Sequence, residues 1–431
     1  MKLSPNLIDH AAEALATVMR FEYPADGVMS RYFRAHEKLG QQDRAFIAET
    51  VFAVLRRKRL LDYLLGDTGA RDMILACLAV LRGHNLRELE SVCTPPELEK
   101  LGAIKQRAHE TLPFEIECDL PDWVIEKLRT GGYSDEPLLA LARSLQRPAP
   151  LDLRVNLSKT SREDALAVLA SSGVEGAAMS YSPAGIRLKE KPALSRHSLY
   201  VEGAIEVQDE GSQLLCYLLG PKRGEMVVDF CAGAGGKTLG LGMLMRSTGR
   251  LYAFDISTSR LTKLKPRLAR SGLSNVHPQH IDSERDPRIG RLVGKIDRVL
   301  IDAPCSGMGT LRRNPDLKWR QTAAGIDELA AKQMRILESA ARLLKPGGQL
   351  VYATCSILAE ENERVVEDFL SRHPEFKLVP AVAELVRRDI ALPENADAGP
   401  YLKLAPDSHQ TDGFFAALLE KVKLVSVKVS S

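Results

Sequence analysis

The chain has 431 residues, of which 45% are hydrophobic and 27% are charged, and its formal net charge is +3. This composition is ordinary for a globular protein, and the length suffices for two or three domains with substantial cores. The nearly neutral charge excludes a uniformly basic nucleic-acid binder, so any basic surface has to be local.

The cysteines and the N-terminal segment indicate a protein of the reducing cytoplasm. The seven cysteines are an odd number without a Cys-x-x-Cys pair, so we expect neither a zinc ribbon nor a redox dithiol, and no metal site. The N-terminal segment is polar and charged, unlike a signal peptide, and no stretch approaches the length and apolarity of a membrane span. We therefore predict a cytoplasmic protein with no membrane partner.

Residues 1–140 are predicted to form an all-helical domain. The clearest helix covers 43–65, where apolar residues recur at helical spacing, and glycines and prolines separate it from its neighbours. Four consecutive cations, Arg56 to Arg59, lie on this helix. Charge alone leaves two interpretations open: a solvated helix face, or a site for RNA phosphates that gains affinity from counterion release.

A small α+β segment is predicted for 148–213. Two prolines at its start mark a break, and the stretch 151–156 then alternates like a strand. A helix at 162–170 follows, with further strands near Ile186 and Leu199. This segment leads into the largest part of the chain.

From residue 214 onward, predicted strands and helices alternate. The strands are 226–230, 250–254, 298–301 and 349–352, with a last strand at 413–419. The helices are 237–245, 258–270 and 327–344. This alternation predicts an α/β fold with a doubly wound parallel sheet over 214–431.

Two Cys-Ser pairs stand where predicted strands end. One is Cys305-Ser306, which closely follows Asp302, and the other is Cys355-Ser356. Ligands bind at that end of the strands in open α/β sheets, so we expect both thiols and the carboxylate at one site. A free cysteine is most often a small buried apolar residue, but two in nearly identical surroundings indicate covalent chemistry.

A glycine-rich loop at 229–238 follows a strand and opens a helix, a placement that suits a nucleotide-like cofactor. It departs from the phosphate-binding P-loop pattern at Cys231 and from the dinucleotide pattern at Thr238. Asp255 closes the next strand, where it can accept hydrogen bonds from a ribose diol or cap the following helix. Asp282 lies in a polar loop from which it can reach an adenine. This combination, without a triphosphate motif, favours S-adenosylmethionine.

Methylation of a pyrimidine at C5 requires groups of the kind found here, because C5 becomes nucleophilic only after a thiolate has added at C6. The reaction needs a nucleophilic cysteine, an acid that interacts with the N3 side of the ring, and a group that completes elimination. Cys355, Asp302 and Cys305 supply this set.

Long stretches of the chain resemble the Sun-type family of RNA cytosine-C5 methyltransferases, which use S-adenosylmethionine. The motifs that carry the resemblance are Val207 to Ser212, Asp229 to Thr238, Asp302 to Gly307, Arg312 to Trp319, and Tyr352 to Ser356. The preceding helices resemble the NusB-like RNA-binding domain of the RsmB-type small-subunit ribosomal RNA enzymes. The resemblance implies a class I methyltransferase domain at 214–431, preceded by the α+β RNA-recognition segment at 148–213 and the NusB-like helical domain at 1–140.

The resemblance also implies roles for individual residues. Cys355 is the nucleophile that attacks C6, Cys305 assists release of the product, and Lys237 lies near the target base. In DNA cytosine methyltransferases the cysteine of a Pro-Cys motif is the nucleophile, which leaves the reversed assignment open. The expected cofactor contacts are Cys231, Ala232, Gly233, Ala234, Gly235, Gly236, Lys237, Asp255, Asp282 and Asp302.

The cofactor loop departs from the family pattern at two positions. The family reads Cys-Ala-Ala-Pro-Gly-Gly-Lys-Thr, whereas this chain has Gly233 and Ala234 in place of the second alanine and the proline. Loss of the proline removes a fixed φ, so we expect a more flexible loop and weaker cofactor binding.

A basic stretch follows the Cys305 loop. It runs from Arg312 to Arg320 and includes Lys318 and Trp319. Cations position a phosphate backbone and an aromatic ring stacks on a base, so this stretch predicts RNA contacts. The alternative is that Trp319 belongs to a core, since tryptophan usually buries most of its surface.

The sequence therefore predicts an S-adenosylmethionine-dependent RNA (cytosine-C5)-methyltransferase that acts on small-subunit ribosomal RNA as a monomer. Other hypotheses are an RNA-binding ribosome assembly factor with a degenerate methyltransferase domain, a methyltransferase acting on tRNA, and one acting on DNA or protein. The intact set of Asp302, Cys305 and Cys355 argues against the degenerate factor. The NusB-like helices argue against DNA and protein substrates.

Overall fold

The computed structural model describes residues 3–66, 68–393 and 397–423. The chain forms two compact units. The first comprises Met1–Pro148 and Thr310–Ala323, and the second comprises Ala149–Gly309 and Ala324–Ser431. Among the described residues, no helix combines the length and the apolar character that a membrane crossing requires.

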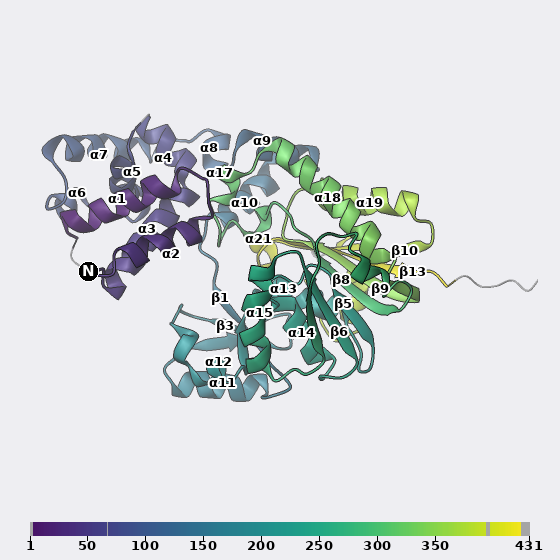
Figure 1. The fold of residues 1–431 in the computed structure, drawn as a ribbon. Coiled ribbons are helices and arrows are strands. Elements are labelled where there is room, and N and C mark those ends of the chain that lie inside the picture. The colour runs from purple at the N-terminus through teal and green to yellow at the C-terminus, as the bar shows by residue number, and fades with distance from the viewer. Residues whose placement is uncertain (1–2, 67, 394–396, 424–431) are drawn as a thin grey trace, which may run out of the picture. The chain divides into compact units, whose positions relative to one another are not determined.

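The first unit is built from helices (Figure 1). They are α1 (Pro5–Val18), α2 (Ala25–Ala35), α3 (Gln41–Arg56), α4 (Lys58–Leu65), α5 (Ala70–Ala76) with a π-helical turn (Cys77–Leu81), α6 (Leu86–Leu89), α7 (Pro95–Arg107), α8 (Phe114–Cys118), α9 (Asp122–Thr130), α10 (Asp135–Leu145) and α17 (Leu317–Arg320). The predicted single helix at 43–65 is wrong in one respect, because the backbone leaves helical geometry at Arg57, with φ −116° and ψ 26°. Apolar side chains of α1, α3 and α5 form the core of this unit.

The four cations Arg56 to Arg59 make internal contacts in the first unit. Three of them form ion pairs with aspartates, namely Arg57 with Asp119, Lys58 with Asp62, and Arg59 with Asp122. Arg56 donates a hydrogen bond to the backbone oxygen of Arg312, and burial lowers the pKa of Arg56 to about 10. These charges therefore stabilise the helical unit. They are not a freely solvated helix face, which was one of our two interpretations of the four cations.

The segment Thr310–Ala323 joins the helical unit, although it follows the Cys305 loop in sequence. Lys318 is buried, and its Nζ donates to the backbone oxygen of Arg56 at 2.9 Å and to Asp119 Oδ1 at 3.1 Å. Trp319 Nε1 donates to the backbone oxygen of Leu55 at 2.9 Å. The prediction of a phosphate contact is thus wrong for Lys318, because its charge is already paired and shielded from solvent. Trp319 is half-buried, so both interpretations that we gave for this residue stay predictions.

The second unit begins with a small antiparallel sheet. Its strands are β1 (Leu151–Val155), β2 (Gly176–Ala178), β3 (Gly185–Leu188) and β4 (Ile205–Val207), in the order β2-β3-β1-β4. Helices α11 (Arg162–Ser171) and α12 (Ser198–Val201) accompany it. The predicted strand near Leu199 is wrong, since Leu199 lies in the short helix α12 and packs into the apolar core of this sheet.

A larger sheet forms the centre of the second unit (Figure 1). Its strands are β5 (Met226–Asp229), β6 (Arg250–Asp255), β7 (Val276–His280), β8 (Ile296–Asp302), β9 (Leu344–Thr354), β10 (Phe376–Val379), β11 (Asp397–Ala398), β12 (Tyr401–Leu404) and β13 (Phe414–Lys421). They follow the order β11-β12-β13-β9-β8-β5-β6-β7, and β10 pairs with β13. Strands β5 to β9 are parallel to their neighbours, whereas β13 runs antiparallel to β9. The predicted doubly wound parallel sheet is confirmed.

Helices cover both faces of this sheet. One face packs on α13 (Glu210–Leu219), α14 (Gly236–Leu244), α15 (Thr258–Ser271) and α20 (Ala381–Val386). The other packs on α16 (Pro287–Gly290), α18 (Ala323–Ala341) and α19 (Glu363–Arg372). A short helix, α21 (Pro406–His409), precedes β13. The chain runs from β5 outward to β7 and then returns to β8, so the carboxyl ends of β5 and β8 flank the point where the strand order reverses. Ligands bind at such a point in open α/β sheets.

Candidate active site

The two cysteines of the Cys-Ser pairs lie side by side. Cys305 follows β8 and Cys355 follows β9, and these strands are parallel neighbours with Asp302 opposite Ala353. The two sulfurs are 3.3 Å apart, and neither cysteine is fully buried. The hydrogen bond to Cys355, followed by burial, raises the pKa of the Cys305 thiol well above its usual value. Cys305 therefore keeps its proton, and either sulfur can be the donor of this hydrogen bond.

A buried carboxylate, Glu361, joins the two cysteine loops. It accepts hydrogen bonds from the backbone N–H of Ser306 at 2.8 Å and from the hydroxyls of Ser306 and Ser356 at 2.5 Å each. Gln333 on α18 donates a fourth bond at 3.0 Å. Each serine directly follows one of the cysteines, so a single side chain holds both thiol-bearing loops. Our sequence reasoning missed Glu361, although the serine repeated after each cysteine was a signal for a shared partner.

Asp302 and Lys237 form an ion pair beside the thiols. Lys237 Nζ lies 2.6 Å from Asp302 Oδ2, and only 11% of the lysine side chain is exposed. Burial lowers the pKa of Lys237, but the charge of Asp302, its hydrogen bond and the charge of Cys355 raise it more, so the net shift is upward. Lys237 therefore stays cationic.

The glycine-rich loop makes a tight turn between β5 and α14. Gly233 and Gly235 have φ values of +56° and +85°, a region that other residues rarely adopt. A Cβ atom at Gly235 would also come within 2.1 Å of Leu264 Cδ1. Ala232 donates its backbone N–H to the oxygen of Phe254 at 2.8 Å, which ties the loop to β6.

Several side chains hold this loop from outside. Asp255 Oδ2 accepts the backbone N–H of Gly233 at 2.8 Å, while its Oδ1 accepts that of Ser257 at 2.7 Å. Arg267 donates to the backbone oxygen of Ala234 at 2.7 Å and is itself paired with Glu206. The two positions that depart from the family pattern are thus each bound to a charged side chain. These contacts restrain the loop where the proline is missing.

The start of α14 is held in the same way. The buried Arg154 from β1 donates to the backbone oxygen of Gly236 at 2.7 Å.

Cys231 lies between β5 and the turn and is not fully buried, and burial raises the pKa of its thiol well above the usual value. Cys231 is therefore neutral and unsuited to act as a nucleophile.

The site carries an excess of carboxylates. Asp229 at the end of β5 is fully buried, and burial together with the charges of Asp302 and Asp255 raises its pKa to about 7, against a hydrogen bond from Thr238. Among the residues that the structure describes, none forms a hydrogen bond with its Oδ1. The chemistry of these acids fits a positively charged ligand, and a phosphate group would be repelled.

Asp282 follows β7, the strand next to β6, and lies in the predicted polar loop. Its side chain is 77% exposed and pairs with Arg288 at 2.7 Å and with His280 at 3.6 Å. Cys305, Cys355, Asp302 and Lys237 are thus brought together, whereas Asp282 contacts a different set of side chains. Its predicted contact with an adenine stays a prediction.

Comparison with known proteins gives matches over most of the chain. The family described as 16S rRNA methyltransferase RsmB/F matches residues 216–420, and the ferredoxin-like domain of RsmF/B-like methyltransferases matches residues 120–195. The probable ribosomal RNA small subunit methyltransferase B of Synechocystis sp. is 34% identical over 94% of this chain and 97% of that protein. The ribosomal RNA small subunit methyltransferase B of Klebsiella pneumoniae is 32% identical over 98% of this chain and 99% of that protein. A crystal structure of a methyltransferase homologue from Pyrococcus horikoshii covers 70% of this chain and all of that one, with a TM-score of 0.57 and 33% identity.

Proposed function

Because this chain belongs to the RsmB/F family of 16S rRNA methyltransferases, we propose that its paired thiols methylate C5 of a cytosine in small-subunit ribosomal RNA. The observation that carries the proposal is the pair of sulfurs 3.3 Å apart beside the Asp302–Lys237 ion pair. Covalent activation of a pyrimidine needs a nucleophilic thiolate and a second group that handles a proton, and this arrangement supplies both.

The acids of the site support S-adenosylmethionine as the methyl donor. Its sulfonium and ammonium groups are cationic, and Asp229, Asp255 and Asp302 stand at the carboxyl ends of β5, β6 and β8. Gly233 and Gly235 have positive φ values, which favour glycine, so the turn carries no Cβ atom at these two positions. The bound cofactor supplies an electrophilic methyl group, and we expect the loop from Cys231 to Lys237 with Asp255, Asp282 and Asp302 to hold it.

In the proposed reaction, the Cys355 thiolate forms a bond to C6, and the electrons of the C5–C6 double bond move to C5, which takes the methyl group. Lys237 stabilises the thiolate before attack, because its charge remains in place beside the sulfur. Asp302 holds Lys237 and faces the N3 side of the ring. A water molecule acting as the base then takes the C5 proton, the electrons of the C5–H bond re-form the C5–C6 double bond, and the Cys355 sulfur leaves C6 as a thiolate. Cys305 assists this release as the hydrogen-bond donor to the departing sulfur.

The test is denaturing gel electrophoresis of the Cys305→Ala protein, expressed with cellular RNA present. We expect a slowly migrating band that collapses on ribonuclease treatment, because attack proceeds while release is impaired. Cys355→Ala should give no such band and no methyl transfer. Cys93→Ala, which changes a half-buried cysteine of the helical unit, is the matched control and should behave as the unmodified protein.

Other results would overturn the proposal in distinct ways. If Cys355→Ala traps RNA and Cys305→Ala does not, the roles of the two cysteines are reversed. If the unmodified protein transfers no methyl group to ribosomal RNA or tRNA and neither variant traps RNA, the chain is an RNA-binding assembly factor. Transfer to tRNA in preference to ribosomal RNA in a competition assay would change the substrate while retaining the chemistry.

A further inference from the structure

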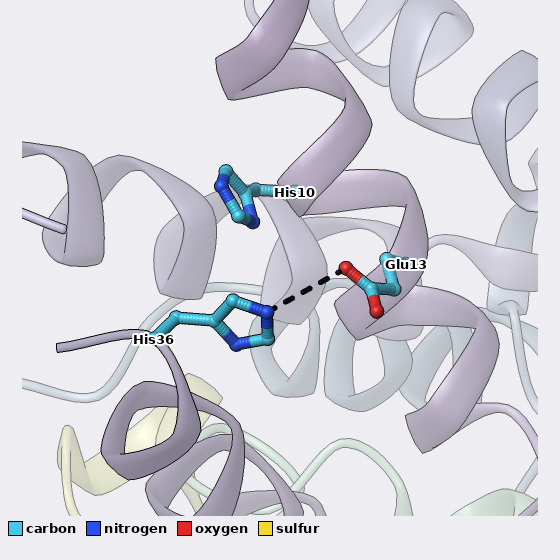
Figure 2. Close-up of side chains that lie close together, drawn as sticks. All are labelled: His10, Glu13 and His36. Atoms are coloured by element: carbon cyan, nitrogen blue, oxygen red, sulfur yellow. Dashed lines mark ion pairs between the residues drawn. The ribbon is translucent and has the colours of Figure 1, made fainter. Parts of the chain in front are cut away.

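We propose that His10, Glu13 and His36 bind a divalent transition-metal ion of the zinc type on the helical unit (Figure 2). In the part of the chain that the structure describes, this is the one place where three side chains of histidine, cysteine, aspartate or glutamate offer ligand atoms that all lie within 4.8 Å of one another. The site is independent of the proposed methyl transfer, since all three residues belong to the first unit.

Two adjacent helices supply the three ligands. His10 and Glu13 lie on α1, three residues apart, so their side chains share one face of that helix. His36 ends α2 as its C-terminal cap. Figure 2 shows the ring of His10, the ring of His36 and the Glu13 carboxylate gathered around a common space. An ion there would therefore link α1 to α2.

His36 is already set in the tautomer that a metal requires. Its Nδ1 lies 2.9 Å from the backbone oxygen of Tyr32, and a carbonyl oxygen only accepts, so Nδ1 carries the proton in the neutral ring. The lone pair is then on Nε2, which lies 3.9 Å from Glu13 Oε2. The ring also stacks on Tyr32, with centroids 4.1 Å apart. Metal-binding histidines are commonly oriented by such a bond from the other ring nitrogen to a backbone oxygen.

The hydroxyl of Tyr32 completes the cluster. It donates to Glu13 Oε2 at 2.8 Å and lies 2.8 Å from His10 Nδ1. Because Tyr32 gives its proton to Glu13, His10 Nδ1 carries a proton and donates it to the Tyr32 hydroxyl. Binding of an ion at His10 Nδ1 would break this contact, and the ring proton would move to Nε2. The bond from Tyr32 to Glu13 would persist and orient the carboxylate.

The donor set and the spacing fit zinc better than calcium or magnesium. Two imidazole nitrogens and one carboxylate oxygen are a set that Zn²⁺ accepts, whereas the two alkaline-earth ions prefer oxygen alone. Two bonds of about 2.1 Å at the tetrahedral angle place donor atoms roughly 3.4 Å apart. The separation of 3.9 Å between Glu13 and His36 therefore needs a small closure. Glu13 is 62% exposed, so its side chain can make this movement and water can take the fourth position.

The test is a titration of full-length protein with Zn²⁺ against a chromophoric chelator. The parent protein carries Cys305→Ser and Cys355→Ser, so that the paired thiols of the candidate active site do not compete for the ion. We expect one equivalent of Zn²⁺ to bind, and binding to weaken about tenfold or more in His36→Ala and in Glu13→Gln. Glu13→Gln keeps an oxygen that can accept the Tyr32 hydroxyl, so it tests coordination without removing that bond.

His84→Ala is the matched control. His84 has nearly the exposure of His36, 32% against 30%, and also faces a glutamate, Glu88 at 3.3 Å. It lacks a third ligand of the same kind within the described residues. Its variant should bind Zn²⁺ as the parent does. Equal affinity and stoichiometry in the parent, His36→Ala and Glu13→Gln, each shown to be folded by circular dichroism, would overturn the proposal.

Discussion

Glu361 is expected to position both thiols without touching the RNA base or the cofactor. Its carboxylate accepts four hydrogen bonds, from Ser306 N–H, the hydroxyls of Ser306 and Ser356, and Gln333. In Glu361→Gln one oxygen remains for Ser306 N–H and Gln333, while the other becomes an amide NH₂ that faces the two hydroxyls. Each hydroxyl loses a charged acceptor but can rotate to accept from the amide.

The expected loss follows from these bonds. A hydrogen bond to a charged group contributes about 1.5–3 kcal/mol, so losing two of them and forming two weaker ones leaves a deficit of about 1.5–3 kcal/mol. The lost hydrogen-bond free energy raises the activation free energy, because the thiols are no longer held in the position for attack. Since about 1.4 kcal/mol corresponds to a factor of ten, methyl transfer should slow by about ten- to a hundredfold.

The assay is transfer of a labelled methyl group to ribosomal RNA in a single turnover. Cofactor affinity, measured by calorimetry, should stay unchanged because Glu361 contacts the cysteine loops and not the glycine-rich loop. A second readout is the rate at which diamide oxidises the Cys305–Cys355 pair to a disulfide. The sulfurs start 3.3 Å apart and must approach to about 2.05 Å, so looser loops should slow this reaction.

Glu367→Gln is the matched control, because Glu367 is an exposed glutamate on the neighbouring helix α19. It should retain the rate and the oxidation behaviour of the unmodified protein. A folded Glu361→Gln protein with the unmodified rate of methyl transfer and of disulfide formation would refute the positioning role.

Two further predictions concern the acids of the site. Asp255→Ala removes the acceptor of the Gly233 and Ser257 N–H groups, so cofactor affinity should fall about tenfold, the effect of losing about 1.4 kcal/mol; an unchanged affinity in a calorimetric titration would refute this role. Burial raises the pKa of Asp229 to about 7, above the value of about 3.9 in the unfolded chain. Between these two pH values the folded protein binds more protons than the unfolded chain, so the free energy of unfolding falls as the pH rises. Asp229→Asn should remove this fall in stability, as measured by denaturant titrations of both proteins at pH 4.5 and 7.5. The same pH dependence in both proteins would contradict the raised pKa of Asp229.

Local patterns predicted much of the fold. The period of the apolar residues located the strands β5, β6 and β8, and the turn signals located the glycine-rich loop that opens α14. We expected a single helix where the structure has two, α3 and α4, separated by the non-helical Arg57. The helical spacing of the apolar residues continues across Arg57, so it gives no sign of the separation. Leu199 was expected in a strand, because a short apolar run does not distinguish a strand from one helical turn.

The chain order and composition by themselves determined which residues could do the chemistry: two Cys-Ser pairs, a lysine at a helix start and acids at strand ends. Only the tertiary structure decided which of them meet. It set the two sulfurs 3.3 Å apart, placed Glu361 between their loops, and paired Lys318 with Asp119 inside the helical unit. The physical reason is that periodicity and turn chemistry act over a few residues, whereas these contacts join residues far apart in sequence. Their geometry depends on how complete strands and helices pack.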